Sequence, residues 1–148
     1  MYKNRSRGFT LIELLVVIAI IGILSAVVLA SLNTARSKGN DAAIQSDLST
    51  VQTQAEIFYG GNGNSYGSPP GSTCSAAGSL FLDPVIVKAI TGMTTAGGGT
   101  APVCGNSSTA YAIEEALSTS GFWCIDSTGF AGKRVSSLTA GVTNCPAS

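Results

Sequence analysis

The stretch that decides the fold is GFTLIELLVVIAIIGIL, residues 8–24, near the amino end of a chain of 148 residues. Its apolar character continues further, because residues 14–32 contain no charge and are interrupted only by Gly22, Ser25 and Ser31. As a helix this segment would span ~28 Å, close to the ~30 Å hydrocarbon core of a bilayer. The sequence therefore predicts a helix that can cross a membrane.

Charge is segregated around this helix. Three basic residues, Lys3, Arg5 and Arg7, precede it, whereas Glu13 is the only acidic residue before Asp41. The positive-inside bias keeps such an amino terminus in the cytoplasm and sends the rest of the chain outward. A carboxylate at the start of an apolar helix is costly in lipid, so Glu13 is a candidate functional residue.

An ordinary secretory signal is the alternative reading of this amino end. Cleavage would then follow a small residue such as Ala30 and release a secreted binding domain. The apolar run is longer than the ~7 to 15 residues of a normal signal core, and Glu13 interrupts its start. We therefore expect an uncleaved anchor.

The helical pattern continues beyond the apolar segment. Apolar residues recur at steps of three and four on one face: Ile44, Leu48, Val51, Ala55 and Phe58. Gly39-Asn40 is the weakest point of this helix, and the glycine-rich run over 60–64 is its first decisive stop. One helix of about fifty residues is predicted, with residues 33–59 as its amphipathic part.

Residues 60–108 are rich in turn-forming residues and are expected to form a long structured loop. Within it we predict a short helix over 83–91, with Asp83 as N-cap, Pro84 at the first helical position and Gly92 after its end. The period then changes to two, which predicts strands over 111–117, 122–125 and 133–138. Residues 109–148 would form a small antiparallel sheet with a tail.

These elements predict an α+β fold, in which the amphipathic helix covers the apolar face of the sheet. The expected core joins the helical face over 44–58 to Tyr111, Ile113, Trp123 and Ile125.

Four cysteines, Cys74, Cys104, Cys124 and Cys145, indicate two disulfide bonds outside the cytoplasm. A zinc site is disfavoured because its ligands usually come in close pairs, and the chain has no histidine. We predict Cys74–Cys104, which encloses the short helix, and Cys124–Cys145, which attaches the tail to the sheet. Four cysteines permit three pairings, and a Cys104–Cys124 bond remains an alternative.

Residues 8–24 closely resemble the amino-terminal motif of type IV pilins and of the pseudopilins of type II secretion systems. The shared features are the basic leader, the Gly8-Phe9 pair, Glu13 five residues after the glycine, and the unbroken apolar helix. The resemblance implies that residues 1–8 are a leader, which prepilin peptidase removes after Gly8, and that Phe9 is then N-methylated. The strict match covers about the first fifth of the chain. Ala30 departs from the pattern, because many type IV pilins carry a helix-breaking proline there.

The resemblance implies a pilin-like structural subunit that polymerises through residues 9–32. Its expected partners are membrane lipid before assembly, prepilin peptidase, an inner-membrane assembly platform, and copies of itself and other pilin-like subunits in a filament. The filament would be extracellular or periplasmic, and a type II secretion pseudopilin is the alternative within the family. Glu13 is expected to be an assembly residue that pairs with the new amino group of Phe9, in the same subunit or in a neighbouring one.

Other classes of function receive little support from the sequence. We predict no catalytic residue and no cofactor, since the chain lacks histidine, a G-x-S-x-G motif and a phosphate-binding loop. We expect no nucleic-acid partner, because few basic residues follow residue 60. Glu114 and Glu115 are expected to be charges at a sheet edge, and Asp126 is expected to form a turn without holding a metal.

Overall fold

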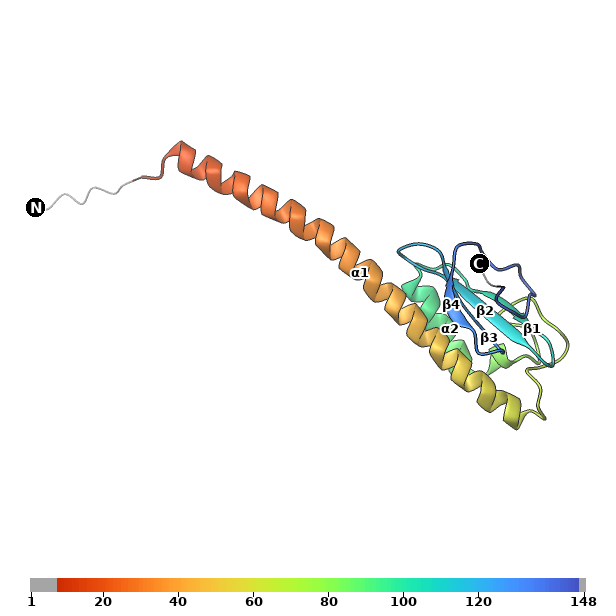
Figure 1. The fold of residues 1–148 in the computed structure, drawn as a ribbon. Coiled ribbons are helices and arrows are strands. Elements are labelled where there is room, and N and C mark those ends of the chain that lie inside the picture. The colour runs from red at the N-terminus through yellow and green to blue at the C-terminus, as the bar shows by residue number, and fades with distance from the viewer. Residues whose placement is uncertain (1–7, 147–148) are drawn as a thin grey trace, which may run out of the picture. The chain divides into compact units, whose positions relative to one another are not determined.

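The computed structural model describes residues 8–146, and Lys3, Arg5 and Arg7 of the predicted leader lie outside the described residues. The order of elements is α1, a 3-10 turn, α2 and four strands (Figure 1). The chain divides after Arg36 into two compact units. The helix α1, Leu11–Gly61, contributes residues to both.

The first unit contains the amino-terminal part of α1. Every described residue from 8 to 36 is exposed, including all the large aliphatic side chains of residues 11–32. This segment is long and apolar enough to cross a membrane. Its helical structure agrees with the sequence prediction, and its side chains have no partner within the described residues that buries them.

In the second unit, α1 contributes one buried face to the core of the head domain. Ile44, Leu48, Val51 and Ala55 are fully buried, as their helical spacing predicted. Helical structure continues through Gly39-Asn40, and α1 ends at Gly61 within the predicted glycine-rich stop. Burial of this face, rather than intrinsic propensity, explains why one glycine does not end the helix.

The predicted loop over residues 60–108 contains a second helix, whose buried side chains belong to the main core. The 3-10 turn Leu80–Leu82 leads into α2, Pro84–Ala96. Asp83 caps α2 as predicted, because its carboxylate accepts hydrogen bonds from the Val85 and Ile86 amides at 2.9 and 3.3 Å. The predicted end at Gly92 is wrong. The helix continues because Met93 is fully buried in the core, and it ends at Gly97.

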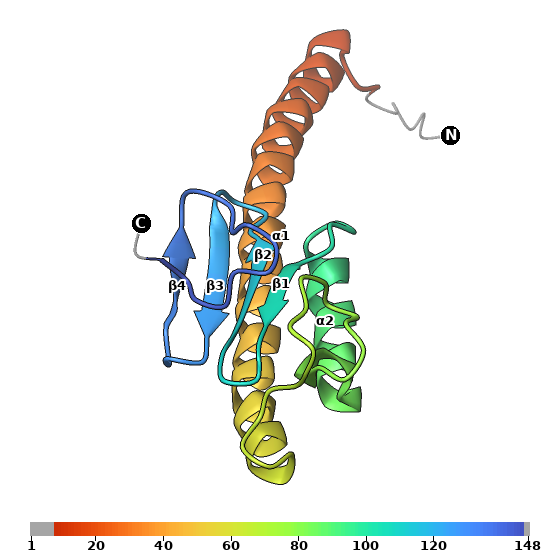
Figure 2. The same ribbon diagram turned by 90° about the vertical axis from the view of Figure 1, so that its right-hand side faces the viewer.

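The sheet has four antiparallel strands in the order β1-β2-β3-β4 (Figure 2). Their bounds are β1 Val103–Asn106, β2 Tyr111–Ala116, β3 Phe122–Asp126 and β4 Ala131–Arg134. The sequence missed β1, which lies inside the predicted loop. It also placed the last strand over 133–138, whereas the chain leaves the sheet after Arg134, whose side chain turns inward to Glu114.

Both faces of the sheet are covered. On one face α1 and α2 form the main core with Tyr111, Ile113 and Ile125, and Trp123 packs against it partly buried. The expected helix-on-sheet core is therefore confirmed. The sequence did not predict that the core also includes Tyr66, Leu80, Phe81, Ile86 and Met93. On the other face the carboxy-terminal tail packs on Ala112 and Cys124 through Leu138 and Cys145.

Candidate functional site

The candidate site is the apolar surface of α1 before Arg36. Its large aliphatic side chains are between 47% exposed, at Val17, and 80% exposed, at Leu11. A continuous apolar surface of this size is unusual on a protein that stays in water. The segment therefore needs lipid or other protein surfaces around it.

Thr10 and Glu13 form a capping box at the start of α1. The Thr10 hydroxyl accepts a hydrogen bond from the Glu13 amide at 3.3 Å, and the Glu13 carboxylate accepts one from the Thr10 amide at 2.8 Å. The Thr10 hydroxyl also donates to this carboxylate at 2.8 Å. Two amides that the helix leaves free are satisfied in this way. The sequence analysis did not use the T-x-x-E pattern, which is a known signal of this arrangement.

Gly8 and Phe9, the predicted cleavage site, precede α1 in an exposed non-helical segment. A peptidase could reach the peptide bond between them without unwinding the helix. In this chain Gly8 and Phe9 are joined, and the Glu13 carboxylate accepts hydrogen bonds from the amide and the hydroxyl of Thr10.

The head is closed by two disulfide bonds, Cys74–Cys104 and Cys124–Cys145. They span 30 and 21 residues. The first joins the long loop to β1 and the second joins the tail to β3. Both pairings agree with those that the sequence favoured. Disulfide bonds of this kind are typical of domains outside the reducing cytoplasm.

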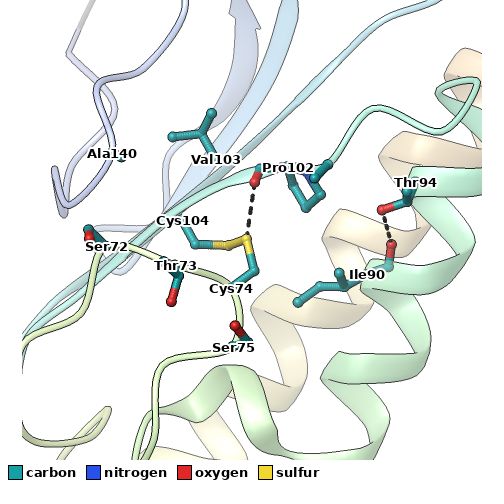
Figure 3. A pocket seen from close by; sticks show the side chains of 11 residues that line it. Ser72, Thr73, Cys74, Ser75, Ile90, Thr94, Pro102, Val103, Cys104 and Ala140 are labelled. Carbon is teal, nitrogen blue, oxygen red and sulfur yellow. Dashed lines mark hydrogen bonds between the residues drawn. A yellow bond between two sulfur atoms is a disulfide. The ribbon is translucent and has the colours of Figure 1, made fainter.

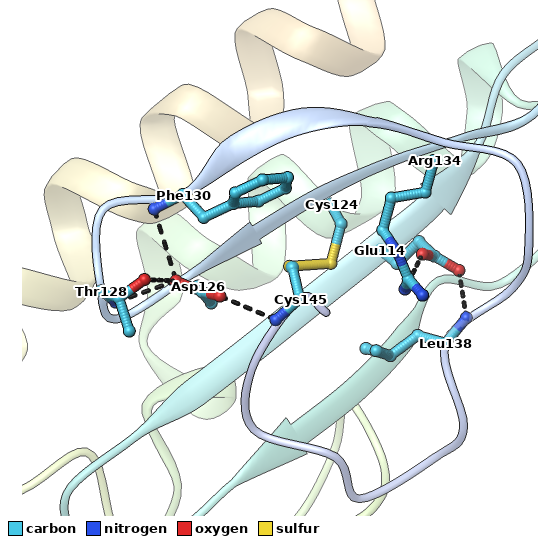
Figure 4. Close-up of a disulfide and its surroundings, with 8 residues drawn as sticks. All are labelled: Glu114, Cys124, Asp126, Thr128, Phe130, Arg134, Leu138 and Cys145. Carbon is cyan, nitrogen blue, oxygen red and sulfur yellow. Dashed lines mark hydrogen bonds and ion pairs between the residues drawn. A yellow bond between two sulfur atoms is a disulfide. The ribbon is translucent and has the colours of Figure 1, made fainter. Parts of the chain in front are cut away.

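Polar contacts hold the tail beside the second disulfide (Figure 4). Glu114 forms a buried ion pair with Arg134 at 2.9 Å and accepts a hydrogen bond from the Leu138 amide at 2.6 Å. Asp126 accepts hydrogen bonds from the amides of Thr128, at 2.9 Å, and Cys145, at 2.7 Å. Asp126 is therefore the predicted turn residue, and it also anchors the tail.

The interpretation of Glu114 and Glu115 as edge charges is wrong. They lie on β2, which is a central strand, and each is 1% exposed. They do point to opposite faces, as neighbours on a strand must. Glu114 is paired beneath the tail, whereas neither carboxyl oxygen of Glu115 has a hydrogen-bond partner among the described residues.

The head also has an apolar groove of about 490 Å³ beside the first disulfide (Figure 3). Ile90, Pro102 and the Cys74–Cys104 bond line it, with Ser72 and Thr94 among its polar groups. None of its lining residues is charged or a histidine. Among residues 8–146, no group of three or more histidine, cysteine, aspartate or glutamate residues could hold a metal ion.

Comparison with known proteins points to one family. Residues 3–29 match the model of the prokaryotic N-terminal methylation motif. The type IV wide pilus major component PilA4 of Thermus thermophilus is 46% identical over 65 residues, which is 44% of this chain and 49% of the relative. The type IV major alpha-pilin of Moraxella bovis is 42% identical over 59 residues, covering 38% of this chain and 37% of the relative.

A secretion protein also matches. The type II secretion system core protein G of Dickeya chrysanthemi is 34% identical over 56 residues, 38% of this chain and 37% of the relative. This chain spans about half or less of the length of the relatives that it matches. No solved structure matches it. The methylation motif and these relatives show that the amino-terminal region of this chain is similar to that of type IV pilins and of a type II secretion system core protein.

Proposed function

We propose that this protein is a structural subunit of a type IV pilus-like filament and that residues 9–32 are its polymerisation helix. The exposure of the entire apolar segment carries this proposal. Contact with neighbouring helices keeps this surface away from water once the filament has left the bilayer, which is worth ~25 cal/mol per Å² of apolar area. A bundle of these helices can therefore hold a filament together without covalent links.

The precursor is inserted in the cytoplasmic membrane with its amino terminus inside and its head outside. Prepilin peptidase removes residues 1–8, and Phe9 becomes the N-methylated amino terminus. The exposed, non-helical position of Gly8 and Phe9 is compatible with this cleavage. The assembly platform of the inner membrane then extracts the mature subunit into the filament.

Glu13 is the assembly residue in this proposal. Cleavage creates a positively charged amino group on Phe9, which pairs with the Glu13 carboxylate of the same or a neighbouring subunit. Such a pair offsets the burial of both charges in the helix bundle and sets the axial register between subunits. The carboxylate must then exchange its contacts with Thr10, at least in part, for the new partner.

A pseudopilin of a type II secretion system is the second candidate, because the secretion system core protein of Dickeya chrysanthemi shares the amino-terminal region. In that case the filament would be a short periplasmic one. Deleting the gene in its source organism separates the two candidates. Loss of surface filaments supports the pilus, whereas retention of secreted proteins inside the cell supports the pseudopilus.

The mature amino terminus tests the proposal. Intact-mass analysis of the protein from its natural host should give a chain that begins at N-methylated Phe9. A chain that begins near Ser31 would instead identify a secreted domain released by cleavage after Ala30, and the filament proposal would fail.

A further inference from the structure

The buried carboxyl group of Glu115 is not explained by filament assembly. Tyr111 and Ile113, which share its face of β2, belong to the main core, so the Glu115 side chain lies on the helix-facing side of the sheet. It is 1% exposed, and both carboxyl oxygens are buried without a hydrogen-bond partner among the described residues. An ionised carboxylate in such a place would be strongly unfavourable.

The carboxyl group lies against the carboxy-terminal turn of α2. A Cβ atom added to Gly97 would be 2.6 Å from Oε1 of Glu115 and 3.2 Å from the Met93 carbonyl oxygen. The absence of a side chain at Gly97 allows this close approach. Carbonyl groups at the end of a helix carry a partial negative charge, which disfavours a carboxylate beside them. A protonated carboxyl group has an O–H that can donate a hydrogen bond to a carbonyl oxygen.

Among residues 8–146, no charged side chain compensates for the burial of the Glu115 carboxyl group. The Asp41 carboxylate of α1 accepts hydrogen bonds from Ser118 and Thr119 in the turn after β2. Lys133 of β4 is exposed and donates a hydrogen bond to the Ser120 hydroxyl. The charged groups on the elements packed around Glu115 are Lys38, Asp41, Asp47 and Glu56 in the part of α1 after Arg36, Lys88 of α2, Glu114 of β2, Asp126 of β3, and Lys133 and Arg134 of β4. None of them forms an ion pair or hydrogen bond with Glu115.

We propose that Glu115 is held as a neutral carboxylic acid that docks the carboxy-terminal turn of α2 on the sheet, and that loss of its proton loosens this turn. The head would thus carry a proton-sensitive contact between α2 and β2. Glu114, the preceding residue on the same strand, is the internal contrast because it forms an ion pair with Arg134 and accepts a hydrogen bond from the Leu138 amide. The proposal is independent of the filament assignment.

The direction of the pH effect follows from burial. Burial raises the pKa of Glu115 from 4.5 to about 7, and the Ala116 amide acts in the opposite direction without forming a hydrogen bond of good geometry. The folded head therefore binds a proton that the unfolded chain releases near its ordinary pKa. The stabilising contribution is complete below about pH 4.5, is lost as the pH rises towards about 7, and then stays constant.

Direct titration of the wild-type chain is the primary test. The full-length protein in detergent micelles is labelled with 13C at the side-chain carboxyl groups of its four glutamates, Glu13, Glu56, Glu114 and Glu115. The resonance that disappears in Glu115→Gln is assigned to Glu115. We expect it to titrate near neutral pH, more than one unit above the 4.5 of an ordinary glutamate. A midpoint near 4.5 would overturn the proposal.

Thermal unfolding of Glu115→Gln gives the second readout. Glutamine keeps the shape of the neutral acid but cannot ionise, so the variant should gain unfolding temperature over the wild type as the pH rises from 4.5 to 8. Amide exchange of Gly97, Gly98 and Gly99, compared at the same pH of 8, should be slower in the variant. Parallel pH profiles and equal exchange would contradict the proposal.

Glu114→Gln is the matched control on the same strand. It leaves the buried Arg134 without its ionic partner, so its unfolding temperature should be lower than that of the wild type at pH 8. A selective gain at high pH in this variant, equal to that of Glu115→Gln, would show that the effect is general to buried acids on β2 and would refute the specific assignment. If Glu115→Gln does not fold, assignment by elimination through Glu13, Glu56 and Glu114 variants keeps the titration decisive.

Discussion

Asp41 is the residue that joins α1 to the turn between β2 and β3. Its carboxylate accepts hydrogen bonds from the Ser118 amide at 2.6 Å and from the Thr119 hydroxyl, and it is 8% exposed. Asp41 and Ser118 are 77 residues apart in the sequence. A hydrogen bond to a charged group contributes about 1.5 to 3 kcal/mol, which makes Asp41 a candidate for the strongest single polar contact between helix and sheet.

We predict that Asp41→Ala lowers the free energy of unfolding of the head by about 2 to 3 kcal/mol, because the Ser118 amide loses its partner in a partly buried place. Asp47→Ala is the control on the same helix, since partial burial, which raises the pKa of Asp47, is the only influence on its carboxyl group and no hydrogen bond contributes, and it should change stability by less than about 0.5 kcal/mol. Denaturant unfolding measures both. Equal effects of the two substitutions would show that the Asp41 contacts contribute nothing specific.

Residue pairs that act across long sequence distances could not be predicted from the chain alone. Glu114 and Glu115 look alike in sequence, and only the position of β2 between β1 and β3, with Arg134 on one side and Gly97 on the other, separates their environments. Thr10 and Glu13 are different. Their spacing is local, so the capping box could have been recognised from the sequence.

At the scale of elements, the apolar face of α1 determines the fold of the head. Ile44, Leu48, Val51 and Ala55 are 0% exposed and contact the main core, which includes residues of α2, β2 and β3. A helix with a single apolar stripe gains most of its stability from such packing. Loss of one large side chain from this face should therefore lower the stability of the whole head.

Leu48→Ala should lower the free energy of unfolding by about 2 to 5 kcal/mol, the usual range for a fully buried leucine. Leu48→Asp should abolish cooperative unfolding, because it places an unpaired charge in the core. The exposed neighbour Ser49 provides the control, and Ser49→Ala should leave the transition unchanged. An unaltered melting curve for Leu48→Asp would show that α1 does not pack on the sheet.

The carboxy-terminal tail is a second layer that depends on a covalent bond. It crosses the outer face of the sheet and is held by Cys124–Cys145, Asp126 and Glu114. Little apolar area holds it in place, since its buried side chains are Leu138 and Cys145.

The backbone of the tail also packs closely on β1. A Cβ atom at Gly105 of β1 would overlap the backbone of Gly141 and Val142.

Replacing Cys124 and Cys145 together by serine should lower the free energy of unfolding by about 3 kcal/mol, as expected for opening a loop of this length. Amide exchange should become faster for Leu138 and Cys145, whereas the buried part of α1 should remain protected. Non-reducing peptide mapping of the wild type supplies the control. Recovery of a Cys104–Cys124 peptide would contradict the pairing on which this prediction rests.

The sequence predicted the elements that are marked by a long periodic pattern or by a short capping motif. Periodicity identified α1 and its buried face, and the Asp83-Pro84 pair identified the start of α2. It did not identify β1, because four residues beside prolines and glycines carry no period and become a strand only by pairing with β2. The end of α2 was also misplaced, since burial of Met93 outweighs the weak helix propensity of Gly92.

At the scale of the whole molecule, the two compact units have different tasks in the proposed function. Residues 9–36 expose an apolar surface that requires lipid or neighbouring helices, whereas residues 37–146 form a head with its own core and two disulfide bonds. Subunits can then be joined through the first unit while the second remains folded. The charge on Glu13 is the feature that must be compensated during this transfer.

The most direct test is the amount of the protein in filaments sheared from cells that lack the wild-type copy, measured by immunoblot. We compare the wild type with Glu13→Ala and Glu13→Gln. Glutamine retains the acceptor that the capping box needs but removes the charge. Processing at Phe9 should be normal in both variants, which intact mass verifies.

We predict abundant wild-type protein in the sheared fraction and a fall of about tenfold or more for both variants, because each leaves the Phe9 amino group without its buried partner. Recovery with Glu13→Gln but not with Glu13→Ala would assign Glu13 to helix capping alone. Wild-type filament yield from both variants, or absence of the wild-type protein from the sheared fraction, would contradict the account of this chain as a subunit that assembles through its amino-terminal helix.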